Sequence, residues 1–127
     1  LIRVKDLMAS EDDIPIVKSG CLMTEAIWEM SKKRLGMLIV VDEENKLIGL
    51  LTDGDLLRAI EKHIDLYNGI IDEAMTVHPY TISEDMLAVK ALQKLKDRHI
   101  NNYPVVNDDD KVIGAITWQM IVNAGIV

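Results

Sequence analysis

The stretch KLIGLLTDGDLLRA, residues 46–59, decides the fold, because a second stretch of the same pattern, KVIGAITWQMIVNA, occupies residues 111–124. Lysine, glycine, threonine and alanine recur at matching places, 65 residues apart. In each copy an apolar run with branched residues predicts a strand, and the residues after the threonine have the apolar spacing of a helix. The sequence therefore predicts a strand that leads directly into a helix, twice.

The repeat continues on both sides of this stretch, and self-similarity of this length indicates duplicated structural units. Three further pairs of segments align, the last of them with a shift of 67 residues: 24–30 with 89–95, 40–42 with 105–107, and Asp6-Leu7-Met8 with Glu73-Ala74-Met75. The change of shift places an insertion or deletion in an intervening loop. We divide the chain into repeat 1, residues 1–66, and repeat 2, residues 67–127.

Each repeat predicts the element order β-α-β-β-α, from period-two and period-3.6 apolar patterns separated by polar turns. The predicted elements are strand 14–17, helix 22–30, strands 37–41 and 46–51 and helix 53–63, then strand 80–82, a helix with Ser83 as N-cap, strands 103–106 and 111–116 and helix 118–124. One unit of about 60 residues cannot bury both faces of its sheet. We therefore expect an α/β (α+β) fold in which the repeats pack by their sheets with pseudo-twofold symmetry, leaving two related clefts.

Composition and charge exclude several classes of function. The 127 residues are 49% hydrophobic and carry a net charge of -7, which argues against binding to nucleic acid or to anionic membranes. No apolar run is long enough to span a bilayer and no signal peptide opens the chain, so we expect a cytoplasmic protein. The single cysteine, Cys21, is either a small apolar filler or a free thiol. Because the chain begins at Leu1, we expect it to be part of a longer polypeptide.

The segment Thr52-Asp53-Gly54-Asp55 has two interpretations. Thr-x-x-Asp is a capping box, in which the hydroxyl and the carboxylate satisfy backbone N–H groups at a helix start. The same start is a potential anion site, where the Thr52 hydroxyl can donate to a phosphate and Asp55 can accept from ribose hydroxyls. The two roles can coexist, because a ligand can replace one cap.

The paired units resemble tandem cystathionine-β-synthase (CBS) domains, the regulatory Bateman module, through a D-L-M-like start and a G-h-h-T-x-x-D-like end, where h is apolar. VKDLMASEDDIPIV, MTEAIWEMSKKRLGMLIVVDEENKLIGLLTDGDLLRAI and the closing AGIV further resemble the CBS pair of D-arabinose-5-phosphate isomerases of the KpsF/KdsD/GutQ type. In that family a sugar-isomerase (SIS) domain precedes the pair. The resemblance thus implies an upstream SIS domain and no catalytic residue in this chain.

The resemblance implies ligand contacts in the two clefts. One cleft is assigned the segment with Ala9 and Ser10 and the strand start at Gly36, Met37 and Leu38. The other is assigned Thr76, Val77 and His78 together with Asn101, Asn102 and Tyr103. The full set of predicted ligand-binding residues is Thr52, Asp55, Gly49, Asp53, Gly54, Met37, Leu38, Ser10, Thr117, Thr76, His78 and Asn102.

Repeat 2 departs from the motif, because Met120 stands where repeat 1 has Asp55 and a thioether is a poor acceptor. If one cleft alone binds a nucleoside, we expect the cleft with Thr52 and Asp55. Trp118 either stacks on a base or fills the second cleft. Four basic residues either meet phosphates or complement helix dipoles: Lys33, Arg34, Arg98 and His99.

The predicted function is regulatory binding of a small-molecule effector, a nucleotide or nucleotide sugar such as CMP-Kdo, in the cleft between repeats. A second hypothesis is an assembly module that forms homodimers through apolar residues of the closing helices, Leu56, Ile60, Ile121 and Val122. A third is a stand-alone sensor of AMP, ATP or SAM. No metal site is predicted, because the histidines are dispersed and the aspartates at 108–110 lack EF-hand spacing.

Overall fold

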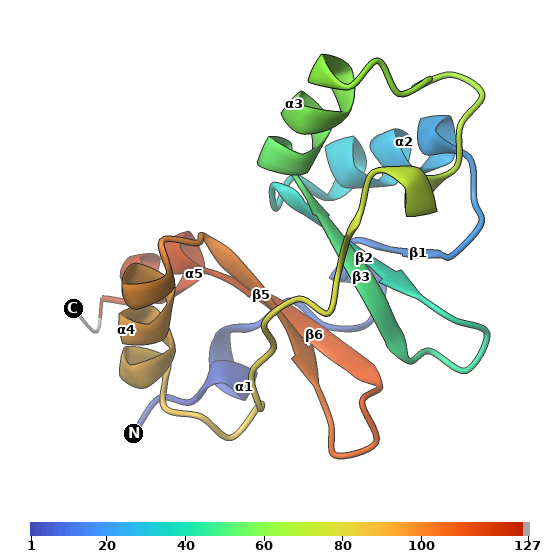
Figure 1. Cartoon of the computed structure of the whole chain (residues 1–127). Coiled ribbons are helices and arrows are strands. Elements are labelled where there is room, and N and C mark those ends of the chain that lie inside the picture. Colours follow the sequence, from blue (N-terminus) through green and yellow to red (C-terminus); the bar gives the residue numbers. More distant parts are fainter. Residues whose placement is uncertain (126–127) are drawn as a thin grey trace. The chain divides into compact units, whose positions relative to one another are not determined.

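The computed structural model describes residues 1–125, which form two compact units (Figure 1). The central unit comprises residues 15–79, and the terminal unit joins residues 1–14 to the chain from Tyr80 onward. These units are not the two sequence repeats, because the first residues of each repeat belong to the unit that holds the strands of the other. Within the described residues, no helix is long and apolar enough to cross a bilayer.

The central unit is built on a four-stranded sheet in the order β1-β2-β3-β4. β1 (Ile16–Lys18) runs parallel to β2 (Met37–Val41), and β3 (Leu47–Thr52) runs antiparallel to β2. β4 (Thr76–Val77) pairs antiparallel with β3 on its other side. All five residues of β2, an interior strand of this sheet, are buried.

Two helices pack on this sheet. α2 (Met23–Lys33) packs on β1 and β2, and α3 (Asp53–Glu61) packs on β3 (Figure 1). A short 3-10 helix, η2 (Ile71–Glu73), lies just before β4. The core of the central unit consists of apolar side chains from both layers, in which the helical members recur at helical spacing: Met23, Ala26, Met30, Leu38, Val40, Leu51 and Ile71.

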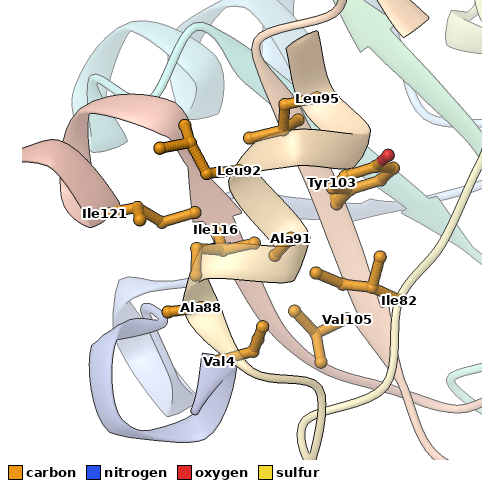
Figure 2. Close-up of a cluster of buried hydrophobic side chains, with 10 residues drawn as sticks. All are labelled: Val4, Ile82, Ala88, Ala91, Leu92, Leu95, Tyr103, Val105, Ile116 and Ile121. Atoms are coloured by element: carbon orange, nitrogen blue, oxygen red, sulfur yellow. The ribbon is translucent and has the colours of Figure 1, made fainter. Parts of the chain in front are cut away.

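The terminal unit repeats this plan with a smaller sheet, the antiparallel pair β5 (Asn102–Val106) and β6 (Val112–Thr117). Two helices, α4 (Ala88–Arg98) and α5 (Trp118–Asn123), lie side by side in it (Figure 1). The start of the chain adds two short helices, α1 (Val4–Leu7) and the 3-10 helix η1 (Glu11–Asp13). Figure 2 shows the core, where side chains of α1, α4 and α5 meet those of the strands: Val4, Ile82, Ala88, Ala91, Leu92, Leu95, Tyr103, Val105, Ile116 and Ile121.

Pro104 explains why the strand predicted before α4 does not extend the second sheet. In the central unit the N–H of Ile39, in β2, donates to the carbonyl of Pro15 at 2.8 Å, next to β1. The residue 65 positions after Ile39 is Pro104, which has no N–H to donate. The strand predicted before α4 is consequently reduced to one parallel bridge, between Ile82 and Val105.

We call the residues that precede the β-α-β-β-α elements of each repeat its lead segment; it includes Ala9 in repeat 1 and Thr76–Val77 in repeat 2. Each lead segment pairs with the closing strand of the other repeat. Ala9 exchanges two backbone hydrogen bonds with Ala115 of β6, at 2.9 and 3.0 Å. The equivalent lead segment of repeat 2 forms β4, which pairs with Gly49 and Leu50 of β3. This exchange gives each compact unit residues from both repeats.

The predicted helix start at Ser83 is wrong, because α4 begins at Ala88. The Ser83 hydroxyl instead accepts the Asp85 N–H at 3.2 Å, which closes a turn before the helix. The carbonyls of Glu84 and Met86 accept backbone N–H groups of α1, at 2.9 and 2.8 Å. These carbonyls are therefore engaged outside any helix, which delays the start of α4 by about one turn.

Replacing His99 by glycine is expected to raise the free energy of unfolding by about 0.5–1 kcal/mol. His99 ends α4 in the left-handed conformation, with φ of 55°, which an L-residue adopts at a cost and glycine adopts freely. Urea unfolding of His99→Gly against the parent chain measures the difference. The same substitution at exposed Lys96, inside the helix, is the control and should lower stability by about 1 kcal/mol; a loss at both positions would contradict the argument.

Candidate functional site

Thr52 is the last residue of β3 and the N-cap of α3. Its backbone is extended, and its hydroxyl accepts the Asp55 N–H at 3.4 Å. Asp55 Oδ2 in turn accepts the Thr52 N–H at 2.9 Å. These reciprocal bonds form a capping box, which confirms the capping interpretation of this motif.

Asp55 is the best-connected side chain of the site. Its side chain is 6% exposed, although it carries a carboxylate. Besides the cap, it accepts the Thr52 hydroxyl at 3.1 Å, the Arg58 Nη2 at 2.7 Å and the Thr76 hydroxyl at 2.8 Å. The carboxylate therefore joins the end of β3, the first turns of α3 and the strand β4.

These bonds determine the charge of the site. Burial by itself raises the pKa of Asp55, but the hydrogen bonds from Arg58, from the Thr52 backbone and from the Thr76 and Thr52 hydroxyls outweigh it. The pKa of Asp55 is consequently lowered from its ordinary value. Asp55 is thus an ionised carboxylate at neutral pH, and it can only accept hydrogen bonds.

The arrangement combines two chemical capacities. The first turn of α3 presents backbone N–H groups and the positive end of a helix dipole, which favour an anionic group. Asp55 beside it offers a strong acceptor for hydroxyl groups, and Arg58, with a side chain 59% exposed, adds a cation. A ligand that carries both hydroxyls and a phosphate matches this combination.

The equivalent position in the terminal unit keeps the cap and loses the carboxylate. The Thr117 hydroxyl accepts the Met120 N–H at 3.2 Å, as Thr52 accepts that of Asp55. Asn102 lies opposite Thr117 in the β5–β6 register, as Met37 lies opposite Thr52 in the β2–β3 register. Trp118 follows the cap with a 42% exposed side chain. This position therefore lacks an acceptor equivalent to Asp55.

Comparison with protein families shows to which family the chain belongs. The family model described as CBS domain matches the chain twice, at residues 4–62 and 71–126. The chain belongs to the CBS domain family. The mixed α+β fold and the tandem organisation expected from the sequence are thereby confirmed.

Arabinose 5-phosphate isomerases are among the relatives of this CBS pair, and their sequences match it over its whole length. The enzyme KdsD of Pseudomonas aeruginosa is 40% identical over 127 residues, which is 100% of this chain and 39% of that protein. KdsD of Escherichia coli K12 is 34% identical over the same length, which is 38% of that protein. The chain thus spans about two fifths of the length of these relatives.

Solved structures of CBS pairs share the fold closely. CBSX2 of Arabidopsis thaliana, in a crystal structure in complex with AMP, superposes with a TM-score of 0.86 at 25% identity, covering 99% of this chain and 97% of that one. The CBS domain pair of protein MJ0100, in complex with 5-methylthioadenosine and S-adenosyl-L-methionine, also has a TM-score of 0.86, at 27% identity, covering 98% and 96%.

The other predicted ligand-binding residues of the central unit have different surroundings. Leu38 belongs to the hydrophobic core, and Met37 is also fully buried. Gly49 lies under the lead segment, where a Cβ would be 3.0 Å from the Thr76 carbonyl oxygen. The remaining three are exposed or half-buried near the surface: Asp53 and Gly54, which begin α3, and His78, which follows β4 with φ of 51°.

The predicted grouping of these residues needs a correction. From the sequence we expect Thr76 to lie with Asn102 and Ser10 to lie with Met37. In the structure Thr76 donates to Asp55 in the central unit, whereas Ser10, the exposed N-cap of η1, belongs to the terminal unit with Asn102 and Thr117. The physical reason is the exchange of lead segments, which pairs each of them with the closing strand of the other repeat.

The apolar residues predicted to form a dimer surface differ in their exposure. Ile121 is fully buried in the core of the terminal unit, so the prediction that it forms a partner surface is wrong. Leu56 is partly buried against the core of the central unit, so only part of its side chain is open to a partner. Ile60 is 56% exposed, and Leu57 beside it is 63% exposed although it was not predicted. The exposed apolar face of α3 therefore consists of Leu57 and Ile60.

Cys21 fits the interpretation as an apolar filler. It packs against the core of the central unit, and burial, with the nearby Glu25 and Asp72 carboxylates, raises the pKa of its thiol. A thiol with a raised pKa is a weak nucleophile at neutral pH. Among residues 1–125, no cluster of His, Cys, Asp and Glu is arranged to hold a metal ion. The last two residues of the AGIV match lie outside this range.

Sequence reasoning missed two partners of Asp55. Arg58 lies three residues further along the same helix, and opposite charges at that spacing are a recognisable signal. Thr76 lies 21 residues away on another strand, and no local pattern connects it to Asp55. The shift of 67 between the lead segments was the only sign that they pair differently from the rest of each repeat.

Proposed function

We propose that this CBS pair is a regulatory module that binds a nucleotide or nucleotide sugar at the Thr52–Asp55 site. The observation that carries the proposal is the buried, ionised Asp55 carboxylate beside the start of α3. There it can accept ribose hydroxyls while the helix start receives a phosphate. When the ligand binds, Thr76 and Arg58 donate to the ligand in place of Asp55. The Asp55 carboxylate stays paired, because it then accepts from the ribose hydroxyls.

The ligand class has support from two sides. Two similar CBS pairs are described in complex with AMP and with S-adenosyl-L-methionine, which supports an adenosine-containing effector. The relatives named arabinose 5-phosphate isomerase support a role in synthesis of the surface-polysaccharide sugar Kdo, for which CMP-Kdo is the matching nucleotide sugar. We propose that an SIS isomerase domain is joined to this pair and is the regulated partner. Regulation requires that the effector bind one conformation of the protein more tightly than another.

The proposal predicts thermal stabilisation by the right nucleotide. A ligand that binds only the folded chain, at about 100 times its Kd, should raise the melting temperature by about 5 °C or more. A thermal-shift experiment with AMP, ATP, S-adenosyl-L-methionine, CMP and CMP-Kdo ranks the candidates. Preference for CMP-Kdo supports feedback in Kdo synthesis, and preference for adenylates supports an energy or methyl-donor sensor.

A matched pair of variants locates the site. Thr52→Ala and Thr117→Ala each remove an N-cap hydroxyl, at a similar cost of about 1 kcal/mol. Isothermal titration with the best nucleotide should show at least about a tenfold loss of affinity for Thr52→Ala, equal to about 1.4 kcal/mol, and none for Thr117→Ala. Equal affinities in both variants would overturn the assignment to the Thr52–Asp55 site.

The exposed Leu57 and Ile60 favour a second candidate, an assembly module without a ligand. Two apolar side chains at this spacing share one face of α3 and are open to a second copy of the chain. Sedimentation of the chain separates the two functions. A dimer that responds to none of the nucleotides would support assembly and contradict the sensor.

A further inference from the structure

Glu29 forms a partly buried anionic contact in the central unit. Its Oε2 accepts from Lys33 Nζ at 2.6 Å and from the backbone N–H of Ile16 at 3.3 Å. The Glu29 and Lys33 side chains are only 16% and 17% exposed. The carboxylate therefore links α2 to the start of the edge strand β1, through one cation and one backbone donor.

The terminal unit keeps the donors of this contact and replaces the anion by a cation. With the repeat shift of 65, Lys33 corresponds to Arg98, Ile16 to Thr81 and Glu29 to Lys94. Lys94 and Arg98 are both half-buried and one turn apart on α4. Like charges at this spacing repel each other, so the arrangement costs stability as long as no anion lies between them.

Asp97, the acid beside Arg98 on α4, has another partner: its Oδ1 accepts from Gln93 Nε2 at 2.9 Å. Within residues 1–125, neither of the two half-buried cations of α4 forms an ion pair, and the Thr81 N–H has no acceptor. In the central unit the corresponding backbone donor is bonded to Glu29. By the correspondence between the repeats, two cations and one backbone donor therefore take the places around the position that a carboxylate oxygen occupies in the central unit.

Arg98 is held in place at this position by two tyrosines. Its guanidinium lies 4.0 Å from the centroid of the Tyr80 ring, and its Nη1 donates to the Tyr103 hydroxyl at 2.9 Å. Tyr103 is fully buried, so this anchor does not move with the surface. A guanidinium has five N–H donors, and four remain after the bond to Tyr103. Arg98 can therefore bind an oxyanion without losing its support.

We propose that the terminal unit binds an oxyanion, a phosphate or a carboxylate, between Lys94, Arg98 and the Thr81 N–H. The anion takes the place that Glu29 holds in the central unit. Guanidinium and ammonium groups with a backbone N–H are the donors that bind phosphate oxygens most strongly. This site lies in a different unit from Thr52 and Asp55 and does not depend on the nucleotide site proposed above.

Lys94→Glu tests the proposal, because it rebuilds the contact of the central unit. In phosphate-free buffer this variant should melt about 2–3 °C above the parent chain. Inorganic phosphate, compared with chloride at equal ionic strength, should raise the melting temperature of the parent chain by about 3–5 °C and leave Lys94→Glu unchanged. Acetate run in parallel distinguishes a carboxylate site, stabilised by both anions, from a phosphate site, stabilised by phosphate alone.

Lys96→Glu is the matched control, since it makes the same charge change at an exposed position of α4 about 200° around the helix from Lys94. It should keep the full response to phosphate. In a 15N-labelled chain, the Thr81 amide resonance should shift on addition of phosphate. An equal response to phosphate in the parent chain and in Lys94→Glu, or no response in the parent chain, would overturn the proposal.

Discussion

Replacing Asp55 by alanine is expected to lower the free energy of unfolding by about 3 kcal/mol. The Asp55 side chain is 6% exposed, and its carboxylate accepts hydrogen bonds from Thr52, Arg58 and Thr76. Truncation removes these charge-assisted bonds at once and leaves the Thr52 N–H, in particular, without its acceptor. Part of the loss is the end of the capping box, which fixes the first turn of α3.

Urea unfolding measured by circular dichroism gives the size of the effect. Asp53→Ala is the matched control, because Asp53 is an exposed acid in the same helical turn. Its removal costs only the dipole interaction, about 0.3–1 kcal/mol. Similar losses in the two variants would contradict a special role for Asp55.

The loss should also depend on pH. The pKa of Asp55 is lowered in the folded chain, so its charge contributes stability above its ordinary pKa. That contribution is lost as the pH falls below about 4 and through the lower folded pKa. The stability of the parent chain should therefore decline over this acidic range more steeply than that of Asp55→Ala. Parallel slopes for the two chains would contradict the link between Asp55 and acid stability.

Much of the fold could be predicted from local patterns. The buried strand β2 is a continuous run of apolar residues, and the polar turn after it separates it from β3, so the hairpin is encoded within about sixteen residues. The cap of α3 is encoded in four residues, because the side chains of Thr52 and Asp55 each accept the backbone N–H of the other residue. Features of this kind depend on neighbours in sequence, and sequence analysis finds them.

The remainder depends on residues that are distant in sequence. Ser83 has the pattern of an N-cap, but the carbonyls after it accept hydrogen bonds from α1, more than 75 residues away. Ile121 follows the apolar pattern of a surface helix, and only the packing of α5 against the core shows that it is buried. Thr76 reaches Asp55 because the lead segments are exchanged. Periodicity shows which face of an element is apolar, but it does not show which element covers that face.

The exchanged lead segments lead to the second large expected effect, at Gly114. An alanine Cβ there would be 2.5 Å from Met8 Sδ and 3.1 Å from the Ala9 carbonyl oxygen. We expect Gly114→Ala to lower the free energy of unfolding by about 2–3 kcal/mol, the range typical of overpacking. In an open strand the same substitution would add stability, since glycine pays more backbone entropy than alanine.

A double-mutant cycle separates the two contacts of Gly114. Met8 has a flexible end, so Met8→Ala with Gly114→Ala should recover part of the loss. The Ala9 carbonyl cannot yield, because the Ala9 backbone is bonded to Ala115 in both directions, so the recovery stays incomplete. Gly54→Ala is the control, as Gly54 lies in α3 with its nearest neighbour 3.4 Å away, and it should raise stability by about 0.5–1 kcal/mol. If Gly114→Ala also raised the free energy of unfolding, the lead segment would not be in close contact with β6. That result would contradict the exchange of segments between the repeats.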